Sequence, residues 1–558
     1  MLPAAVPARG NPTPTEPPGD SSVPDRLGEV AAYLRRHMTD TRTPGFAYAI
    51  VQGDRVVGQG AWGVDGDGRR ITVDTPFVLG SVTKSFTGLA VMQLVEAGRV
   101  ELDQPVRRYV PWLRLADESV AARITVRQLL THTTGLPQVA AMGLTDRYDN
   151  TPDGLARSVR DLAAVRVTAE PGGLHQYSDA NYQILGVLVE EVTGQPYGEH
   201  LRRSVLDPLG MSRSAATEAE ARSLGGIPAG HRYYVGHPRR FAPPFDGSGV
   251  SYGFLAASLT DVTHYVMAQL NDGRYADRSV LSAPGVAQLH TGLAGTSGTG
   301  RYAMGWRDDT LSGTGERIVW HAGATANFFG HIVLVPGSDL AVVVLGNSYS
   351  LAMDPPLTSA AFNAVQILRG GTPVTAEADP IFGWILAGLV TVGVLLLALL
   401  VWSLVRWRRL VRLVRQSAPA RPTPTPASPV APGPGLTSGP ASSLTSASAS
   451  TLASASASTL TSASAPTLVP ASGPTSVGLS PGRTVGVTVG WLLGCAVVVA
   501  GAAWALPRSW DGARLSQVVL FAPDIGHAIV AVVGLATALA LVRLGLGGYV
   551  LAVARART

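Results

Sequence analysis

The sequence predicts an α+β domain over residues 24–370, followed by three transmembrane helices in the C-terminal third of the chain. Two observations lead to this fold class. Strand patterns lie near both ends of the domain and helical patterns lie between them, which is typical of an α+β domain whose sheet is closed by its two ends. Beyond residue 380, apolar runs reach the length of about 20 residues that a bilayer span needs.

Composition supports the membrane-spanning part of this prediction. Hydrophobic residues make up 46% of the 558 residues and charged residues only 15%, and the mean hydropathy is +0.20. Such a chain is too apolar for disorder and too poor in charge for an ordinary soluble protein. Because Cys495 is the only cysteine, a disulfide framework, a zinc finger and an iron–sulfur site are excluded.

The N-terminal segment predicts an arm, a helix and a hairpin. Residues 1–23 are rich in proline, glycine and small polar residues, which favours a disordered arm. The apolar runs 46–51 and 56–57 flank turn residues 52–54 and predict a β-hairpin. Between arm and hairpin, apolar residues recur at helical spacing, at Leu27, Val30, Ala31 and Leu34.

The C-terminal end of the domain predicts three more strands. They cover residues 317–320, 328–335 and 340–345, with Pro336 and Gly337 as a turn between the last two. These strands and the N-terminal hairpin supply the predicted sheet.

Three apolar runs predict the membrane spans, at residues 381–405, 485–506 and 525–542. Residues 406–484 are basic at first and then rich in Pro, Ala, Ser and Thr. This composition cannot bury a core, so the segment is expected to be a disordered linker.

The charge distribution predicts the orientation of the spans. Residues 381–558 hold 12 arginines and two acidic residues, whereas residues 1–380 hold 32 basic and 37 acidic residues. A basic excess beside apolar runs indicates membrane orientation, not nucleic-acid binding. The positive-inside rule places the linker in the cytoplasm and the domain outside the cell. A cytoplasmic domain is the alternative, because residues 1–8 lack the features of a complete signal peptide.

Lys84 is the only lysine among the 44 lysine and arginine residues. A codon bias explains a drift towards arginine, but it does not explain one remaining lysine. Arginine cannot be deprotonated at workable pH, whereas a partly buried lysine can be, so Lys84 is a candidate base. The alternative is a surface lysine that remains by chance.

Ser81 precedes Lys84 by three residues in a helical pattern, which places both side chains on one face, one turn apart. Gly80 permits a tight turn into this helix, and Gly98 is a C-cap signal. Free N–H groups and the positive end of the helix dipole stabilise an alkoxide at such a position. Ser81 and Lys84 therefore form a workable nucleophile–base pair, whereas the alternative for Ser81 is a helix cap.

Several motifs in a fixed order carry a family resemblance. Ser-x-x-Lys spans residues 81–84 and is followed by related motifs at residues 129–137, 176–186, 207–211, 304–306 and 320–323. Over about residues 24–370 the chain resembles the serine β-lactamase and penicillin-binding superfamily, in the branch of class C β-lactamases, D-amino-acid peptidases and related esterases. The resemblance implies an antiparallel sheet flanked by helices, with a mostly helical subdomain.

The resemblance also implies the roles of matching residues. Ser81 would be the acylated nucleophile, Lys84 would accept its proton, and Tyr177 would be the second acid/base. A phenol near a lysine ammonium would have its phenolate favoured. The N–H groups of Ser81 and Ala324, which follows Gly323, would form the oxyanion hole, where one donor typically contributes about 3 kcal/mol.

Two substrate-site residues depart from the family pattern. Asp179 stands where the family usually has asparagine; it would either pair with Lys84 and favour its charged form, or select substrates with N–H or ammonium groups. His321 stands in the third motif, His-Ala-Gly, where lysine is usual. The resemblance implies that His-x-Gly members are more often peptidases or esterases than efficient β-lactamases.

Other candidate residues receive structural interpretations. We expect His132 to be packed in the core. Residues 65–68 form a hairpin turn and lack the remaining ligands of a calcium loop, so no metal and no cofactor are predicted. Ser251 lies in a Gly-x-Ser-x-Gly sequence, but no apolar strand precedes it, so a nucleophile elbow is not expected.

The sequence thus predicts a membrane-anchored serine hydrolase that acts outside the cell on an ester, amide or D-amino-acid peptide, with the lipid bilayer as its other partner and no nucleic acid. Two alternatives remain open. One is a cell-wall binding or sensory protein that stays acylated, and the other is an acyl transferase or peptide cyclase of the same fold.

Overall fold

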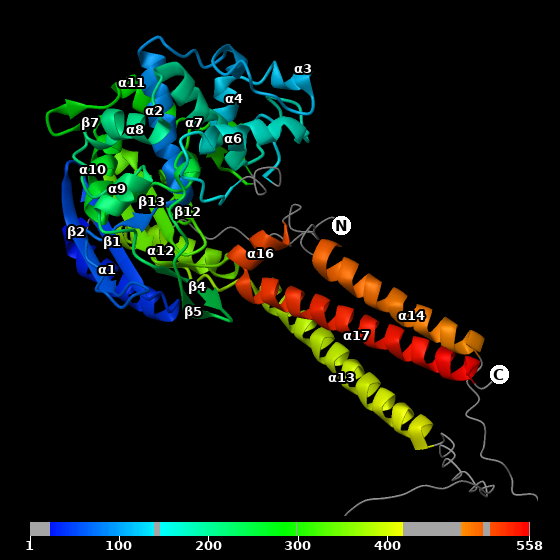
Figure 1. Ribbon diagram of the computed structural model, residues 1–558. Helices are drawn as coiled ribbons and strands as arrows, with labels where there is room; N and C mark the ends of the chain where they lie inside the picture. The colour runs from blue at the N-terminus through cyan, green and yellow to red at the C-terminus, as the bar shows by residue number, and fades with distance from the viewer. Residues whose placement is uncertain (1–22, 139–144, 297, 417–480, 506–513, 557–558) are drawn as a thin grey trace, which may run out of the picture. The chain divides into compact units, whose positions relative to one another are not determined.

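The computed structural model describes residues 23–138, 145–296, 298–416, 481–505 and 514–556 (Figure 1). Its central element is an eight-stranded antiparallel sheet with the strand order β2-β1-β14-β13-β12-β11-β10-β9. The strands are β1 (Gly45–Gln52), β2 (Arg55–Gly63), β9 (Ala294–Gly295), β10 (Arg301–Tyr302), β11 (Arg307–Thr310), β12 (Arg317–Ala324), β13 (Phe329–Val335) and β14 (Leu340–Gly346).

The two ends of the domain meet in this sheet, as the strand patterns predict. Strand β1 pairs with β14 so that Phe46 lies opposite Gly346 and Gln52 opposite Leu340. The predicted hairpin is β1 and β2, and its turn contains Gly53 at φ +59°. A positive φ is tolerated by glycine, which explains why the chain reverses here.

Both faces of the sheet are covered. Phe46, Tyr48 and Ile50 of β1 pack in one apolar cluster with residues of α1 (Val23–Asp40) and α12 (Asp354–Leu368). Ala47 and Ala49 alternate with them and pack in a second cluster with residues of α2 (Thr83–Glu96), α7 (Asp179–Thr193) and α10 (Leu259–Leu270). Alternate side chains of a strand point to opposite faces, so a strand buried on both sides reads as one continuous apolar run.

The helices and short strands complete the domain. The helices are α1 (Val23–Asp40), α2 (Thr83–Glu96), α3 (Glu118–Ala121), α4 (Val126–Leu130), α6 (Gly154–Arg160), α7 (Asp179–Thr193), α8 (Tyr197–Leu201), α9 (Glu218–Ser223), α10 (Leu259–Leu270), α11 (Ala283–His290) and α12 (Asp354–Leu368). The short strands are β3 (Phe77–Val78), β4 (Gly230–Tyr234), β5 (His237–Phe241), β6 (Ala256–Ala257), β7 (Arg274–Tyr275), β8 (Arg278–Ser279) and β15 (Ser348–Tyr349). The predicted α+β class, an antiparallel sheet flanked by helices with helical segments between its strands, is confirmed.

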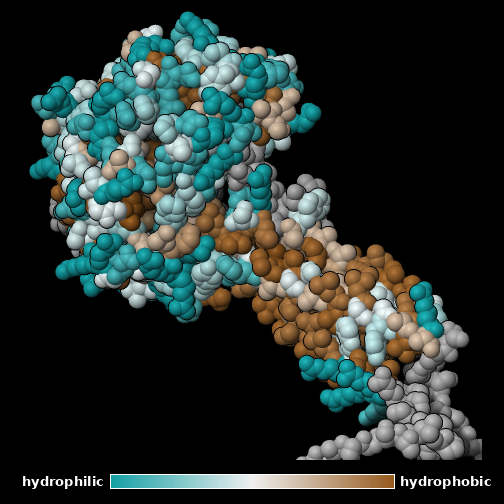
Figure 2. All heavy atoms as spheres, viewed as in Figure 1, coloured by the Kyte–Doolittle hydropathy of each residue, from teal (hydrophilic) through white to brown (hydrophobic). Residues whose placement is uncertain are grey.

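Helix α1 begins at Val23, inside the predicted arm, whose other residues lie outside the described part of the chain. Three long apolar helices follow the domain, α13 (Pro380–Gln416), α14 (Pro481–Ala500, extended to Ala505 by a π-helical turn) and α17 (Pro523–Arg555). Each is long and apolar enough to cross a membrane. Their exposed side chains are predominantly apolar, which Figure 2 shows in brown. The short helix α16 (Leu515–Phe521) precedes α17.

Three span boundaries differ from the prediction. The arginine-rich residues 406–416 continue helix α13 instead of starting a linker, because arginine is a good helix former. Residues 481–484 are helical, and residues 417–480 of the predicted linker lie outside the described residues. Helix α17 continues past Arg543, where the predicted span ends. The guanidinium of Arg543 lies 4.9 Å from the ring centroid of Trp402 and 4.1 Å from that of Trp491, and such cation–π contacts offset part of the cost of an arginine in an apolar helix.

Candidate active site

Ser81 lies in a 3₁₀ turn (Gly80–Val82) that leads directly into α2. Gly80 has φ +56°, and a Cβ atom there would lie 2.2 Å from the amide nitrogen of Ala324. A Cβ on Gly323 would lie 2.4 Å from the amide nitrogen of Ser81. Because neither glycine carries a Cβ atom, the turn packs directly against the end of β12. The amides of Ser81 and Ala324 therefore lie close together.

Lys84 is fully buried in the first turn of α2, below Ser81. Its Nζ donates to Ser81 Oγ at 2.9 Å and to the Tyr252 carbonyl oxygen at 2.8 Å. Nζ also forms an ion pair with Asp179 Oδ1 at 2.6 Å. A lysine ammonium has three N–H donors, and three acceptors surround it here.

Asp179 is the first residue of α7, where the helix dipole stabilises a negative charge. The Gln138 side chain forms two hydrogen bonds with Asp179. The Gln138 side chain donates Nε2–H to Asp179 Oδ2 at 3.1 Å, and its Oε1 accepts from the Asp179 amide at 3.1 Å. Of the two interpretations that the sequence left open for Asp179, the ion pair with Lys84 is present in the structure.

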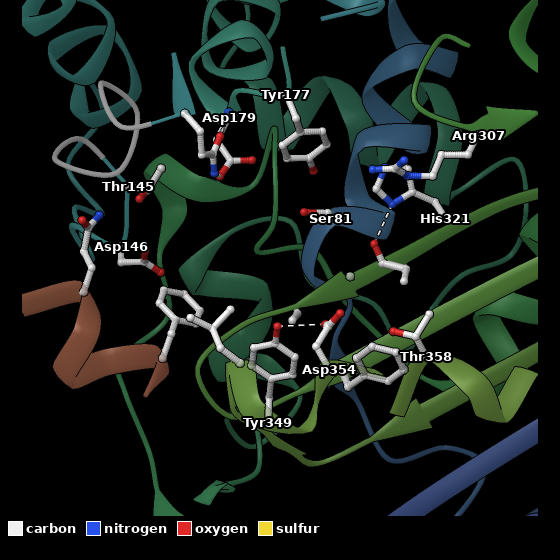
Figure 3. Close-up of a pocket in the computed structure, with 18 of the residues that line it drawn as sticks. Ser81, Thr145, Asp146, Tyr177, Asp179, Arg307, His321, Tyr349, Asp354 and Thr358 are labelled. Carbon is white, nitrogen blue, oxygen red and sulfur yellow. Dashed lines mark hydrogen bonds between the residues drawn. The ribbon is translucent and has the colours of Figure 1, made fainter. Parts of the chain in front are cut away.

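The Tyr177 ring lies over Lys84, with 5.0 Å between its centroid and Nζ. Figure 3 shows its hydroxyl pointing towards the Ser81 side chain. Burial, and then the negative charge of Asp179, raise the pKa of Tyr177 well above its usual value. This runs against the expectation that the lysine favours the phenolate, because desolvation and the Asp179 charge both favour the protonated phenol.

His132 packs behind Tyr177, as expected of a structural histidine. Its ring centroid is 4.3 Å from that of Tyr177, and its Nδ1 accepts from the Ser178 amide and from Asn181 Nδ2. Burial lowers the pKa of His132 well below its usual value, so the ring is neutral. It fixes the backbone beside Tyr177 and does not line the pocket.

His321 is buried on β12 between the pocket and Tyr302. Its Nδ1 donates to the Ala322 carbonyl at 2.6 Å, and its Nε2 lies 3.1 Å from the Tyr302 hydroxyl. Burial, and then the positive charges of Arg307 and Lys84, lower the pKa of His321 well below its usual value. A neutral ring with Nδ1 protonated leaves Nε2 as an acceptor for the Tyr302 hydroxyl.

These residues border one cavity of about 690 Å³, a size usual for small-molecule and peptide sites. Figure 3 shows Ser81 between Tyr177 and His321, with Asp179 on the side of Tyr177. All seven predicted site residues therefore belong to one cluster, in which Lys84 lies beneath the floor and the other six line the cavity.

Sequence reasoning missed several residues of this cluster. Tyr252 contributes its backbone carbonyl, which no side-chain pattern indicates, and its ring centroid lies 5.8 Å from Lys84 Nζ. Gln138 directly follows the motif at residues 129–137, and its position beside that motif was the available signal. Arg307 lines the cavity, and within the described residues no carboxylate lies within ion-pair distance of it.

The competing nucleophile Ser251 is buried away from the cavity. A 3₁₀ turn (Gly247–Gly249) precedes it, not a strand, and its carbonyl accepts from Thr87. The Gly-x-Ser-x-Gly loop thus supports α2 from behind. Asp65 accepts from the amides of Asp67 and Arg69 in a tight turn, and among the described residues no cluster of three metal-binding side chains was found.

A sequence profile of the family described as "Beta-lactamase" matches residues 30–365. The chain belongs to the β-lactamase family. The family assignment confirms the resemblance that the ordered motifs indicate. Members are related to the penicillin-binding proteins, and the fold described above is the β-lactamase and penicillin-binding type.

One curated relative and one solved structure carry penicillin-binding names. The chain is 34% identical over 324 residues to "Penicillin-binding protein 4" of Amycolatopsis lactamdurans, covering 55% of this chain and 82% of that protein. It is 28% identical over 329 residues to "Protein flp" of Staphylococcus aureus (strain N315), and it spans 63% of that protein's length and 58% of its own. A solved structure, the octameric penicillin-binding protein homologue from Pyrococcus abyssi, is similar with a TM-score of 0.55 and 26% identity over 65% of this chain and 81% of the other.

Proposed function

We propose that this β-lactamase-family protein is a membrane-anchored serine hydrolase that is acylated on Ser81 and then releases the acyl group to water. The observation that carries this proposal is the 2.9 Å hydrogen bond between Ser81 Oγ and the buried amine of Lys84 at the edge of the cavity. A serine hydroxyl is a weak nucleophile until a neighbouring base takes its proton.

The surrounding residues supply the other requirements of acyl transfer. The Ser81 and Ala324 amides form the oxyanion hole for the tetrahedral intermediate. Tyr177, which keeps its proton, donates it to the leaving group and is protonated again afterwards. In the second half of the reaction, water takes the place of the leaving group and the same groups act in reverse.

The substrate class is an ester, an amide or a D-amino-acid peptide. Arg307 lines the cavity next to His321, and an arginine without a carboxylate partner favours a substrate with its own carboxylate. We therefore expect a peptide with a free C-terminal carboxylate to react faster than the same peptide with a C-terminal amide, and Arg307→Ala to remove most of this difference.

We place the domain outside the cell and the residue 406–484 segment in the cytoplasm, on the arginines that follow the first apolar helix. Protease treatment of intact cells tests this. Cleavage of the domain supports the proposal, whereas full protection until the cells are lysed contradicts it.

The activity is tested by labelling the full-length protein with a fluorophosphonate and with a penicillin probe. We expect fluorophosphonate labelling that Ser81→Ala abolishes and Ser251→Ala preserves, with weak penicillin labelling. With an ester substrate, a burst followed by steady turnover supports a hydrolase. A single stoichiometric acylation would instead indicate a binding or sensory protein, and aminolysis faster than hydrolysis would indicate an acyl transferase.

A further inference from the structure

We propose that Ser81, Lys84 and Asp179 form a proton relay, in which the Asp179 carboxylate takes the proton that Lys84 must lose before it accepts one from Ser81. This inference rests on the proposed acylation of Ser81. It gives a role to Asp179, which departs from the asparagine that the family pattern leads one to expect at this position.

The surroundings of Lys84 require such an acceptor. An ammonium donates all three of its hydrogens and has no lone pair, so it cannot accept a proton. Its three neighbours here are the Ser81 hydroxyl, the Tyr252 carbonyl and the Asp179 carboxylate. Of these three groups only the carboxylate can take up the proton, because a backbone carbonyl and a hydroxyl are far weaker bases.

Lys84 and Asp179 lie close enough for a proton to pass between them. The N–O distance between Lys84 Nζ and Asp179 Oδ1 is 2.6 Å, and the contact is an ion pair, not an aligned hydrogen bond. Lys84 is fully buried, and the Asp179 side chain is 16% exposed. Removing a charge from water is costly, and proton transfer within this pair removes two charges from a mostly buried site at once.

Gln138 determines which Asp179 carboxylate oxygen faces Lys84. It binds Asp179 Oδ2 and the Asp179 amide, so Oδ1 remains directed at Lys84. Asp179 acts on Ser81 only through Lys84, so it is a positioning and proton-holding residue and does not touch the reacting atoms.

The relay conserves every proton. In the resting state Ser81 is a hydroxyl, Lys84 an ammonium and Asp179 a carboxylate. An N–H bond of Lys84 breaks as an O–H bond forms at Asp179 Oδ1. The Ser81 oxygen then bonds to the acyl carbon while its proton moves to the free amine. When the bond to the leaving group breaks, the leaving group takes a proton from Tyr177, Lys84 reprotonates Tyr177, and the proton held by Asp179 returns to Lys84.

The relay also separates the acid from the base. Tyr177 stays protonated because burial and the charge of Asp179 both raise its pKa. His321 Nε2 already faces the Tyr302 hydroxyl, so it does not offer a free lone pair to Ser81. The Lys84–Asp179 pair therefore activates the nucleophile, and Tyr177 serves the leaving group.

A fluorophosphonate isolates the first of these two tasks, because fluoride leaves without needing a proton. We would measure the second-order labelling rate of the full-length protein with Asp179→Asn, which preserves shape, and Asp179→Glu, which preserves the carboxylate. We expect Asp179→Asn to lower the rate by about 100-fold or more, the range of general-base catalysis, and Asp179→Glu to recover at least about tenfold of that loss. The KM for an ester substrate should change far less than kcat.

Glu218→Gln is the matched control. Glu218 is also the first residue of a helix, α9, but it is exposed and pairs with Arg222, so its loss should change the rate by less than about twofold. Melting temperatures of all variants separate a lost relay from lost folding. If Asp179→Asn does not fold, the labelling rate of folded Asp179→Glu decides. A loss of rate of more than about 100-fold overturns the relay, and a smaller loss supports it.

When both variants fold, two results overturn the relay. One is an Asp179→Asn protein that labels within about threefold of wild type, which would show that asparagine serves equally well. The other is an Asp179→Glu protein that regains stability but no labelling, which would show that shape alone matters. Failure of the proposed function looks different, because the wild-type protein would then not be labelled, or Ser81→Ala would still be.

Discussion

At the scale of single residues, the chemistry of the site is concentrated on one amine. Lys84 is the only lysine of the sequence, and it is buried against Ser81, Asp179 and the Tyr252 carbonyl. A guanidinium is planar, larger and always charged, so it neither fits three acceptors arranged around one nitrogen nor gives up a proton. This explains how one lysine persists in a chain that otherwise uses arginine.

Lys84→Arg should therefore be nearly inactive although it keeps the positive charge. We expect the fluorophosphonate labelling rate to fall by about 100-fold or more, which is the usual contribution of a general base. Arg127→Lys is the matched control, since it exchanges the cation type in a solvent-exposed pair with Asp103 and should leave labelling unchanged. An active Lys84→Arg protein would refute the requirement for an amine.

The hydroxyl of Tyr177 has a different task, and its removal should separate two reactions. Tyr177→Phe deletes the proton donor for the leaving group, so hydrolysis of an amide substrate should fall by about 100-fold. Fluorophosphonate labelling should stay within about threefold, because fluoride needs no proton. Tyr182→Phe removes a nearby buried hydroxyl that donates to the Leu130 carbonyl, and it controls for stability alone. Equal losses in both reactions of Tyr177→Phe would contradict this division of roles.

At the scale of elements, the site depends on the close approach of the Gly80–Val82 turn to the end of β12. Gly80 and Gly53 both have positive φ, +56° and +59°, but only Gly80 faces neighbouring backbone. The substitution of alanine at each position separates the cost of the backbone conformation from the cost of the missing space.

Gly53→Ala should cost about 1 kcal/mol of stability, the strain of a left-handed alanine, with no loss of labelling. Gly80→Ala adds a Cβ at 2.2 Å from the Ala324 amide and should both lower stability further and abolish labelling of Ser81. Chemical denaturation and labelling of the two variants check this. Equal behaviour of the two would contradict a tight contact at Gly80.

Much of the element layout is readable from the sequence, for physical reasons. Helical spacing and turn residues are local signals, so the hairpin of β1 and β2, the strands β12 to β14 and the helix after Ser81 are predicted close to where they lie. The end of α13 is not, because its arginines continue the helix beyond the apolar run. The end of α17 is not, because Arg543 is accommodated by tryptophans distant in the sequence. In the site, side-chain motifs predict Ser81 and Lys84, whereas the Tyr252 carbonyl and the protonation of Tyr177 depend on packing that no motif encodes.

At the scale of the whole molecule, the stability should depend on pH through buried neutral histidines. Burial lowers the pKa of His290 and His331 to about 3 and of His37 to about 4. When the pH falls below the usual histidine pKa of about 6.5, these histidines bind protons in the unfolded chain but stay neutral in the folded chain. Acid therefore favours unfolding. Five carboxyl groups with raised pKa oppose this, among them Asp146 at about 7, but eight described histidines have lowered values.

We therefore expect the melting temperature of the domain in the full-length, detergent-solubilised protein to fall as the pH is lowered from 6.5 to about 4. Each well-buried histidine costs on the order of 1–3 kcal/mol by the end of that range. Scanning calorimetry at several pH values measures this. A melting temperature that rises over the same interval would show that the carboxyl groups dominate.

We expect Ser81 to be the residue that becomes acylated, and mass spectrometry of the labelled protein locates the adduct. After fluorophosphonate treatment of the intact protein and digestion, we predict the added mass on the peptide that contains Ser81, at one adduct per chain, and no adduct in Ser81→Ala. An adduct on Ser251 or another serine, or undiminished labelling of Ser81→Ala, would contradict the acylation of Ser81.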